Sequence, residues 1–359
     1  MTQARDLADL AGAATAGTIT GRNLIINGAM TVAQRGTTHT QSPNSGNYHT
    51  VDRYSYRRTG TWSGVTAVVL SQQSSGAPSG FTHFLRYAPT GSDSSTPSDT
   101  SMYIDAKLEG NSVSSLALGT SAAKSFTISF YVRSSVTGTF CVSFQNNDST
   151  EYSYLAEYTI NSANTWEQKE ITVDAPTSGT FPTDTSTGLA IYFIVSADSS
   201  SSTYSTSTVG SWLASTDARW SSNQSDGVTK TANQTFDITG VQLEVGETAT
   251  PFEHRSFGDE LRRCQRYCFT QAGFTRGDVA IGDADVGTTR LYSALSINTS
   301  GSIVFFNYPT TLRKVPDLSY TTAGGGVVSN DYSSTDRLAI RDSDDINWYI
   351  HSFKAEAEL

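Results

Sequence analysis

Residues 235–269 constrain the fold of this chain most, because the spacing of their apolar residues changes once along the run. In the first half, apolar residues recur at about every second position, which is typical of a strand with one buried face: Phe236, Ile238, Val241, Leu243 and Val245. Gly246 and Pro251 then interrupt the pattern. After Ser256 the spacing becomes four, three and four, which is one face of a short helix: Phe257, Leu261, Cys264 and Cys268. We therefore predict a strand, a turn and a helix that joins two β regions.

The rest of the chain is rich in segments typical of strands. About ten such segments with regular turn residues between them precede the helix, at 24–26, 48–57, 65–70, 81–88, 101–108, 126–134, 139–144, 154–160, 165–173 and 189–196. Further strands are expected after it, at 288–297, 302–306, 317–321, 338–341 and 348–356. The predicted fold is all-β: a jelly-roll β sandwich, a short joint helix and a smaller C-terminal β domain.

This pattern divides the chain into four parts. We expect an N-terminal helical segment and linker at 1–21, the jelly roll at 22–250, the joint at 251–269 and the C-terminal β domain at 270–359. Because the last part has few large aliphatic residues, it has a thin core of its own. Trimerisation would supply the missing burial.

Composition and charge narrow the function classes. Of the 359 residues, 37% are hydrophobic and 16% charged, which suits hydroxyl-rich β sandwiches better than an α/β enzyme. The net charge of -10 argues against a nucleic-acid partner, since phosphate binding needs a basic face. No apolar run reaches transmembrane length and residues 1–10 lack a hydrophobic leader core, so we expect a soluble protein without membrane insertion or export. The cysteines have no metal-ligand spacing and are expected to be reduced thiols.

Several runs resemble tail-fibre and related receptor-binding proteins of tailed bacteriophages. They are DITGVQLEVG at 237–246, TPFEHRS at 250–256, ELRRCQRY at 260–267, ARDLADL at 4–10 and NLIINGAM at 23–30. In addition, 126–133 and 166–173 resemble strands of jelly rolls similar to carbohydrate-binding modules. The resemblance implies a virion structural protein, assembled in the bacterial cytoplasm and released by lysis. It would form a homotrimer and contact other virion tail or head proteins and host surface polysaccharide or lipopolysaccharide.

Two N-terminal leucines are candidates for attachment. Leu7 and Leu10, followed by Ala14, recur at helical spacing over a segment too short to be stable alone. Three chains could bury this stripe against one another, or it could dock into another virion protein. The alternative is a frayed terminus.

A structural Ca²⁺ is the one cofactor we expect. The resemblance to carbohydrate-binding jelly rolls implies that Asp237, on the closing strand, helps to hold it. Two aspartate groups in Gly-rich or polar loops also offer hard oxygen ligands, at 278–285 and 342–345. Neither group has the spacing of a known calcium loop. The alternative interpretation is that both groups are solvated turn residues.

The glycan platform is predicted in the aromatic-rich loop 204–220. Trp212 and Trp220 are the first candidates for flat sugar-binding faces, together with Tyr204. Asp217, Arg219 and Asn223 are expected to be the polar partners. A loop of this length in a compact domain is usually functional. The alternative is that one or both tryptophans pack beneath the loop or in a subunit interface.

We expect no enzymatic activity. The chain has no HExxH motif, GxSxG elbow or P-loop, and nothing favours any one acid pair for glycoside cleavage. Our hypothesis is a trimeric tail fibre or short appendage that joins the particle by its N-terminus and contacts host surface glycan. The alternatives are a purely structural head fibre or tail connector without glycan binding, and a polysaccharide depolymerase.

Overall fold

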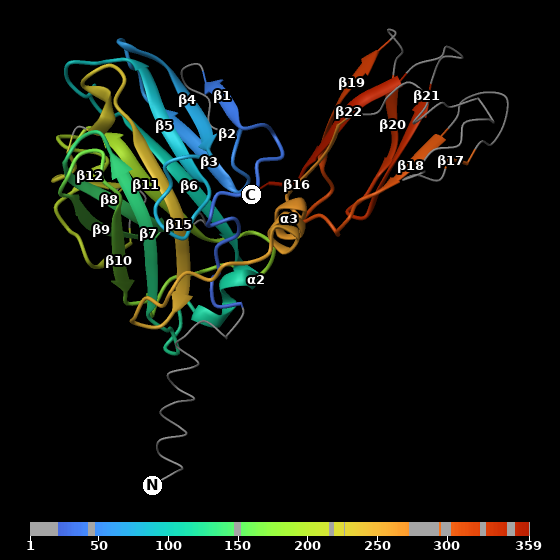
Figure 1. The fold of residues 1–359 in the computed structure, drawn as a ribbon. Helices are drawn as coiled ribbons and strands as arrows, with labels where there is room; N and C mark the ends of the chain where they lie inside the picture. The colour runs from blue at the N-terminus through green and yellow to red at the C-terminus, as the bar shows by residue number, and fades with distance from the viewer. Residues whose placement is uncertain are drawn as a thin grey trace. The chain divides into compact units, whose positions relative to one another are not determined.

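The computed structural model describes residues 21–41, 47–146, 152–214, 219–225, 227–272, 294–295, 303–323, 328–342 and 349–358. The chain divides into two units between Phe257 and Gly258 (Figure 1). This division falls inside the predicted joint at 251–269. Leu7, Leu10 and Asp217 lie outside the described residues, as does the loop group at 278–285.

The first unit contains two facing antiparallel sheets. The six-stranded sheet has the order β1 (Thr38–Gln41), β4 (Val65–Gln73), β5 (Phe84–Gly91), β15 (Phe236–Val245), β7 (Phe126–Ser134) and β10 (Glu167–Val173). The seven-stranded sheet has the order β13 (Trp212–Leu213), β9 (Ser153–Ile160), β8 (Gly138–Gln145), β11 (Thr187–Ala197), β6 (Ser101–Glu109), β3 (Tyr54–Thr59) and β2 (Asn47–Tyr48). The chain crosses repeatedly from one sheet to the other, which confirms the predicted jelly-roll β sandwich.

Short elements complete this unit. A helical turn, α2 (Gly110–Val113), leads into a 3₁₀ turn, η2 (Ser114–Leu116), after β6. Between β11 and β15 the chain forms a small parallel pair, β12 (Ser205–Thr206) with β14 (Trp220–Ser221), and then the 3₁₀ turn η3 (Gly227–Thr229).

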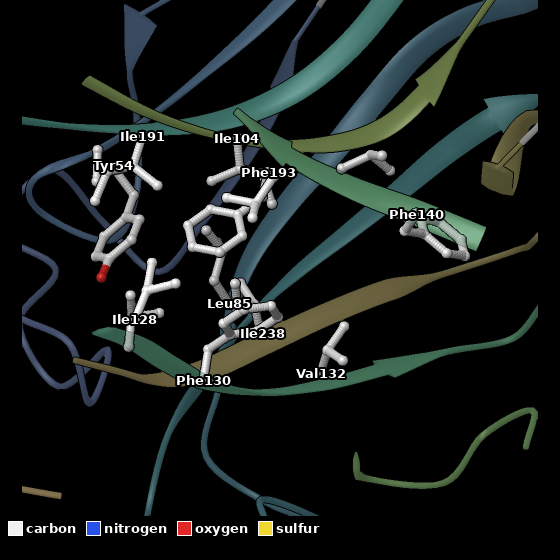
Figure 2. Close-up of a cluster of buried hydrophobic side chains, with 14 of the residues drawn as sticks. Tyr54, Leu85, Ile104, Ile128, Phe130, Val132, Phe140, Ile191, Phe193 and Ile238 are labelled. Atoms are coloured by element: carbon white, nitrogen blue, oxygen red, sulfur yellow. The ribbon is translucent and has the colours of Figure 1, made fainter. Parts of the chain in front are cut away.

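The core lies between the two sheets. Alternate residues of β7, Ile128, Phe130 and Val132, point inward and are fully buried. Across the sandwich, the ring of Phe130 meets that of Phe193 edge-on, with 5.2 Å between centroids (Figure 2). Burying one such side chain contributes about 1.5–3 kcal/mol. The alternation of Ile128, Phe130 and Val132 therefore gives β7 an apolar face that packs into the core.

Strand β15 has the predicted bounds but contains a β-bulge. Its register against β7 shifts between Thr239 and Gln242. Gly240 lies at this bulge with a φ of +63°, and a Cβ there would meet the rings of Phe81 and Tyr131. The extra residue changes the phase of alternation, so Ile238 and Val241 both point into the core. The expectation that Val245 shares this buried face is wrong: it is 43% exposed, at the strand end.

The predicted strand at 24–26 does not form. Asn23 uses its own side chain to bind the backbone here: its Oδ1 accepts from the N–H of Ile25 at 2.9 Å and of Leu243 at 3.1 Å. Asn27 then adopts a φ of +60°. These asparagines replace ladder hydrogen bonds with side-chain bonds. The backbone bonds to β15 are therefore the separated ones from Leu24 N–H to the Leu243 carbonyl and from Val241 N–H to the Gly28 carbonyl, not a regular ladder.

The segment around Asn23 is tied to the end of the sandwich by a closing network, which we define as Asn23, Gln242, Glu253 and Arg255. The Glu253 carboxylate accepts from the N–H groups of Gly21 and Asn23, at 2.6 and 2.7 Å. The Glu253 N–H donates to Gln242 Oε1 at 2.8 Å, and Arg255 donates to the carbonyl of Ile25 at 2.9 Å. Burial opposes ionisation of Glu253, but the backbone donors and Arg255 outweigh it and lower its pKa.

The second unit begins at Gly258, within the first turn of α3 (Phe257–Gln265). It contains a three-stranded sheet of order β16 (Cys268–Ala272), β22 (Tyr349–Glu356) and β19 (Asp317–Ala323). A four-stranded sheet has the order β17 (Ala294–Leu295), β18 (Ile303–Asn307), β21 (Arg337–Asp342) and β20 (Val328–Ser333). On α3, Cys264 is buried as expected, but Phe257 is 59% exposed, so its placement on the buried face is wrong. All three cysteines are free thiols.

Asp237 binds arginines. Its two carboxylate oxygens accept from Nε and Nη2 of Arg86 on β5, at 2.8 and 2.9 Å. Arg133 on β7 donates to the same carboxylate at 2.9 Å, and its guanidinium lies 4.6 Å from the ring centre of Trp166. The prediction of Asp237 as a calcium ligand is wrong, because two guanidinium charges occupy and neutralise its carboxylate. Calcium elsewhere in the chain stays a prediction.

We predict that Asp237→Asn lowers the free energy of unfolding by about 2–4 kcal/mol, because it leaves two arginines, on the two strands that flank β15, without their shared counter-ion. The matched control is Asp259→Asn, since the Asp259–Arg262 pair on α3 is mostly exposed and contributes less than about 1 kcal/mol. Urea unfolding with and without EDTA measures both. A wild-type midpoint that falls with EDTA while Asp237→Asn has no effect would contradict the arginine assignment.

Candidate functional site

The long connection between β11 and β15 crosses the outer face of the seven-stranded sheet. Beneath it lies a small apolar cluster formed by Cys141, Leu155, Ile194, Ala197 and Trp220. Trp220 is 2% exposed, and its indole N–H donates to the carbonyl of Asp198 at 2.8 Å. The prediction of Trp220 as a sugar platform is therefore wrong, because the ring fills the space between the connection and the sheet.

Trp212 does not pack in the same cluster as Trp220. It is half-buried on β13, at the edge of the seven-stranded sheet, where it pairs with Tyr154 of β9. Its ring lies 5.5 Å from that of Tyr154 and 6.0 Å from that of Phe181, and its indole N–H donates to the Asp174 carbonyl at 2.6 Å. The two tryptophans therefore do not form the single platform that the sequence predicted.

Three tyrosines gather on the apolar cluster that Trp220 completes. Tyr103 of β6, Tyr192 of β11 and Tyr204 all pack against it and are half-buried. Tyr103 and Tyr192 meet edge-on, with 5.2 Å between ring centres, and Tyr204 lies 5.5 Å from the Trp220 ring. We call these three residues the tyrosine face. Two of them, Tyr103 and Tyr192, belong to β6 and β11, which are neighbouring strands in the middle of the sheet (Figure 1).

Tyr204 was among the predicted site residues, whereas Tyr103 and Tyr192 were missed. A pattern in the sequence could have indicated them. Each tyrosine lies between two large apolar residues of a strand, Met102 and Ile104 in one case and Ile191 and Phe193 in the other. Because alternate residues point to opposite faces, burying these neighbours places both tyrosines on the outer face.

Asp105 lies beside the tyrosine face with one oxygen unsatisfied. It is paired in register with Tyr192 on one side and Ser55 on the other, and it has no exposed surface. Its Oδ1 accepts from the Ser55 hydroxyl, while its Oδ2 is buried without a hydrogen-bond partner. Burial raises the pKa of Asp105 despite the nearby Lys107 and Arg57. An unsatisfied buried acceptor costs about 1–3 kcal/mol, so Asp105 lowers the stability of the fold at this position.

Two arginines approach the tyrosine face. Arg57 of β3 is exposed and is paired in register with Tyr103. The Arg219 guanidinium lies 4.8 Å from the ring centre of Tyr204, and its backbone N–H donates to the Tyr204 carbonyl at 2.9 Å. Burial, with a further contribution from Asp105, raises the pKa of Tyr103 to about 12, while Arg57 and Arg219 act in the opposite direction. Arg219 thus lies beside Tyr204, while its predicted role as a polar partner of a sugar platform stays a prediction.

The tyrosine face combines half-buried aromatic rings with a few fixed polar groups. Binding sites for small ligands generally have this composition. In the part of the chain that the structure describes, no group of three or more His, Cys, Asp or Glu side chains could hold a metal ion. Within the same residues, no helix is long and apolar enough to span a membrane.

No protein-family model and no curated protein matches the sequence. Several solved structures are similar in fold. The enzymatically active domain of bacteriophage CBA120 tailspike protein 4 has 10% identity and a TM-score of 0.33, over 62% of this chain and 21% of that one. A family 4 carbohydrate-binding module has 12% identity and a TM-score of 0.29, over 61% and 98%. A family 11 module of a Clostridium thermocellum cellulase has 12% identity and a TM-score of 0.29, over 58% and 99%. The fold assignment therefore rests on the strand order of this chain.

We predict that Asp105→Asn stabilises the protein relative to wild type increasingly as the pH rises from 4 to 8. The pKa of Asp105 is raised above 3.8 in the folded state, so the stability it contributes is full below the unfolded pKa and is lost as the pH rises through the folded pKa. Asparagine has no charge to bury and avoids this loss. Urea unfolding of both proteins across this pH range measures the difference.

The control is Asp184→Asn. Hydrogen bonds from Ser186 lower the pKa of Asp184, so the stability contributed by this carboxylate is lost as the pH falls. The control difference should therefore have the opposite sign. Parallel pH profiles for wild type and Asp105→Asn would show that the Asp105 carboxylate is solvated and not buried beneath the tyrosine face.

Proposed function

We propose that this protein is a virion protein of a tailed bacteriophage that binds host surface glycan through the tyrosine face. The observation that carries the glycan-binding part is the clustering of three half-buried tyrosines beside the exposed Arg57 and the guanidinium of Arg219. Aromatic rings present flat apolar faces to the C–H groups of a sugar while their hydroxyls bond to its oxygens. The polar groups around them then fix the orientation of the sugar.

The virion part of the proposal is supported by the sequence resemblance to tail-fibre proteins. In this proposal the protein is a homotrimer, a tail fibre or short appendage, attached to the particle through the segment that contains Leu7 and Leu10. Three copies of a shallow site would act together, and multivalency of this kind strengthens binding by about 10²–10⁴. A shallow tyrosine face is therefore sufficient for adsorption to a host polysaccharide or lipopolysaccharide.

We expect the purified full-length chain to have a native mass three times that of one chain, because the second unit gains burial by association. Light scattering on the protein at micromolar concentration measures this mass. A native mass equal to that of one chain would contradict the trimer. Several copies could then act together only when they are bound to the same particle.

We predict that Tyr103→Ala and Tyr192→Ala each weaken binding to host-derived polysaccharide at least tenfold, or about 1.4 kcal/mol, because each removes a ring that faces the sugar. The control is Tyr131→Ala, a half-buried tyrosine on the outer face of the opposite sheet, packed against Phe81. Labelled trimer binding to immobilised capsule and lipopolysaccharide gives the dissociation constants, and unfolding midpoints verify that each variant is folded.

Three outcomes would contradict the proposal. Undiminished binding by the two variants would place the glycan site elsewhere. Absence of any glycan binding, with the protein still incorporated into particles, would favour a purely structural head fibre or connector. Release of reducing ends from the polysaccharide would show a depolymerase.

A further inference from the structure

A buried arginine on the inner face of β3 has a donor that no residue of the described ranges satisfies. Arg58 is 6% exposed and forms no ion pair within those ranges. Its Nη1 donates to the Val65 carbonyl at 2.7 Å and its Nη2 to the Trp62 carbonyl at 3.1 Å. Its Nε is buried without a hydrogen-bond partner among the same residues. Two neutral carbonyls therefore hold a buried positive charge, and one N–H group stays unsatisfied.

Asp93 influences this charge but is bound to other groups. Its carboxylate accepts from the Ser63 hydroxyl at 2.9 Å and from the N–H groups of Gly64 and Val65 at 2.7 and 3.1 Å. Burial lowers the pKa of Arg58, whereas nearby tyrosines and Asp93 act in the opposite direction. An arginine stays protonated in proteins, so the positive charge persists. A buried charge is costly unless a group of opposite sign pairs with it and its donors are satisfied.

A second unsatisfied donor lies on the same face of β3. Tyr56 precedes Arg58 by two residues, so both side chains point to the inner side of the sheet. In the part of the chain that the structure describes, the buried Tyr56 hydroxyl has no hydrogen-bond partner. The Tyr87 hydroxyl donates to Met102 Sδ at 2.6 Å, and Met102 is paired in register with Arg58. Burial raises the pKa of Tyr56, while Tyr87 and Arg58 act in the opposite direction, so these three side chains lie near one another.

The two unsatisfied groups are both donors, which limits the ligand that could satisfy them. Water could accept from both, but it would add two protons that need acceptors, and it carries no charge. A small anion accepts both hydrogen bonds and also compensates the guanidinium. We propose that the first unit binds a monovalent inorganic anion of the size of chloride between Arg58 Nε and the Tyr56 hydroxyl. This site is independent of the proposed glycan-binding function.

The connection from β3 to β4 covers the same guanidinium. Trp62 and Val65, whose carbonyls accept from Arg58, are 5% and 0% exposed. The Arg58 guanidinium carbon lies 5.9 Å from the centre of the Trp62 ring. The anion would therefore stabilise the closure of this connection over the end of β3. Because it binds the folded protein, its effect on stability rises with its concentration.

The test compares the stability of the full-length protein in two salts at one ionic strength. Urea unfolding is followed in sodium chloride and in sodium gluconate, whose anion is too large for a site between two buried side chains. We expect the folding equilibrium constant to be at least about threefold higher in about 150 mM chloride, which corresponds to a dissociation constant of about 75 mM or less. Crystals soaked in bromide should show an anomalous peak within hydrogen-bond distance of Arg58 Nε and the Tyr56 hydroxyl.

Two conservative variants locate the effect. Tyr56→Phe removes one of the two donors and should remove most of the difference between the salts. The matched control is Tyr158→Phe, because Tyr158 is another buried tyrosine whose hydroxyl has no partner in the described residues. It lies on β9, which three strands separate from β3 in the same sheet. The control should retain the full difference between the salts.

The outcomes separate an anion from a water molecule. Equal stability of the wild type in the two salts, with water and no bromide beside Arg58, would overturn the anion site. A chloride effect that Tyr56→Phe leaves intact would also overturn it, because the ion would then bind elsewhere. A difference that Tyr56→Phe removes and Tyr158→Phe retains, with bromide beside Arg58, would support the assignment.

Discussion

The closing network is the interaction on which the rest of the first unit depends. It joins residues more than two hundred positions apart, because Asn23 and Glu253 lie at opposite ends of the sandwich sequence and bind each other and β15. Its members are largely buried, and a buried polar group that loses its partner costs about 1–3 kcal/mol. Removing one side chain of the network therefore leaves the hydrogen-bonding groups of several other members without partners. The network makes closure of the sandwich cooperative and specifies one register for β15 in the middle of its sheet.

The closing network explains in part why this sequence resembles phage proteins in short separate runs. Three of the runs that carry it, at 23–30, 237–246 and 250–256, contain the four residues of the closing network. They are separate in sequence and adjacent in the structure. Their residue types are required by hydrogen bonding within the fold, so the resemblance concerns how the sandwich is closed. The proposed glycan site lies elsewhere, on the outer face of the other sheet.

The outer faces of the two sheets are built differently. On the six-stranded sheet, Asp237 joins Arg86 and Arg133 across three strands, and Trp166 covers Arg133. The Asp237 carboxylate is therefore paired within this face. On the seven-stranded sheet, Trp220 of the connection between β11 and β15 packs on the apolar cluster, and three half-buried tyrosines pack against the same cluster. The exposed Arg57 and the guanidinium of Arg219 lie beside these rings, which is why the glycan site is proposed on this face.

The sequence by itself determined the strands that have one apolar and one polar side, and the helix that follows them. Strands β7 and β15 and the start of α3 agree with the predicted bounds to within one residue, because alternation and helical spacing are local properties. The irregular path at 24–26 was missed, since the asparagines that shape it bind residues far along the chain. Only the tertiary structure decided what covers each outward-facing residue. Asp237 meets arginines from neighbouring strands, Trp220 is buried by a returning connection, and Tyr103 and Tyr192 meet only because β6 and β11 are paired. The period of a strand specifies which face a residue points to, whereas its exposure and partners depend on contacts between distant segments.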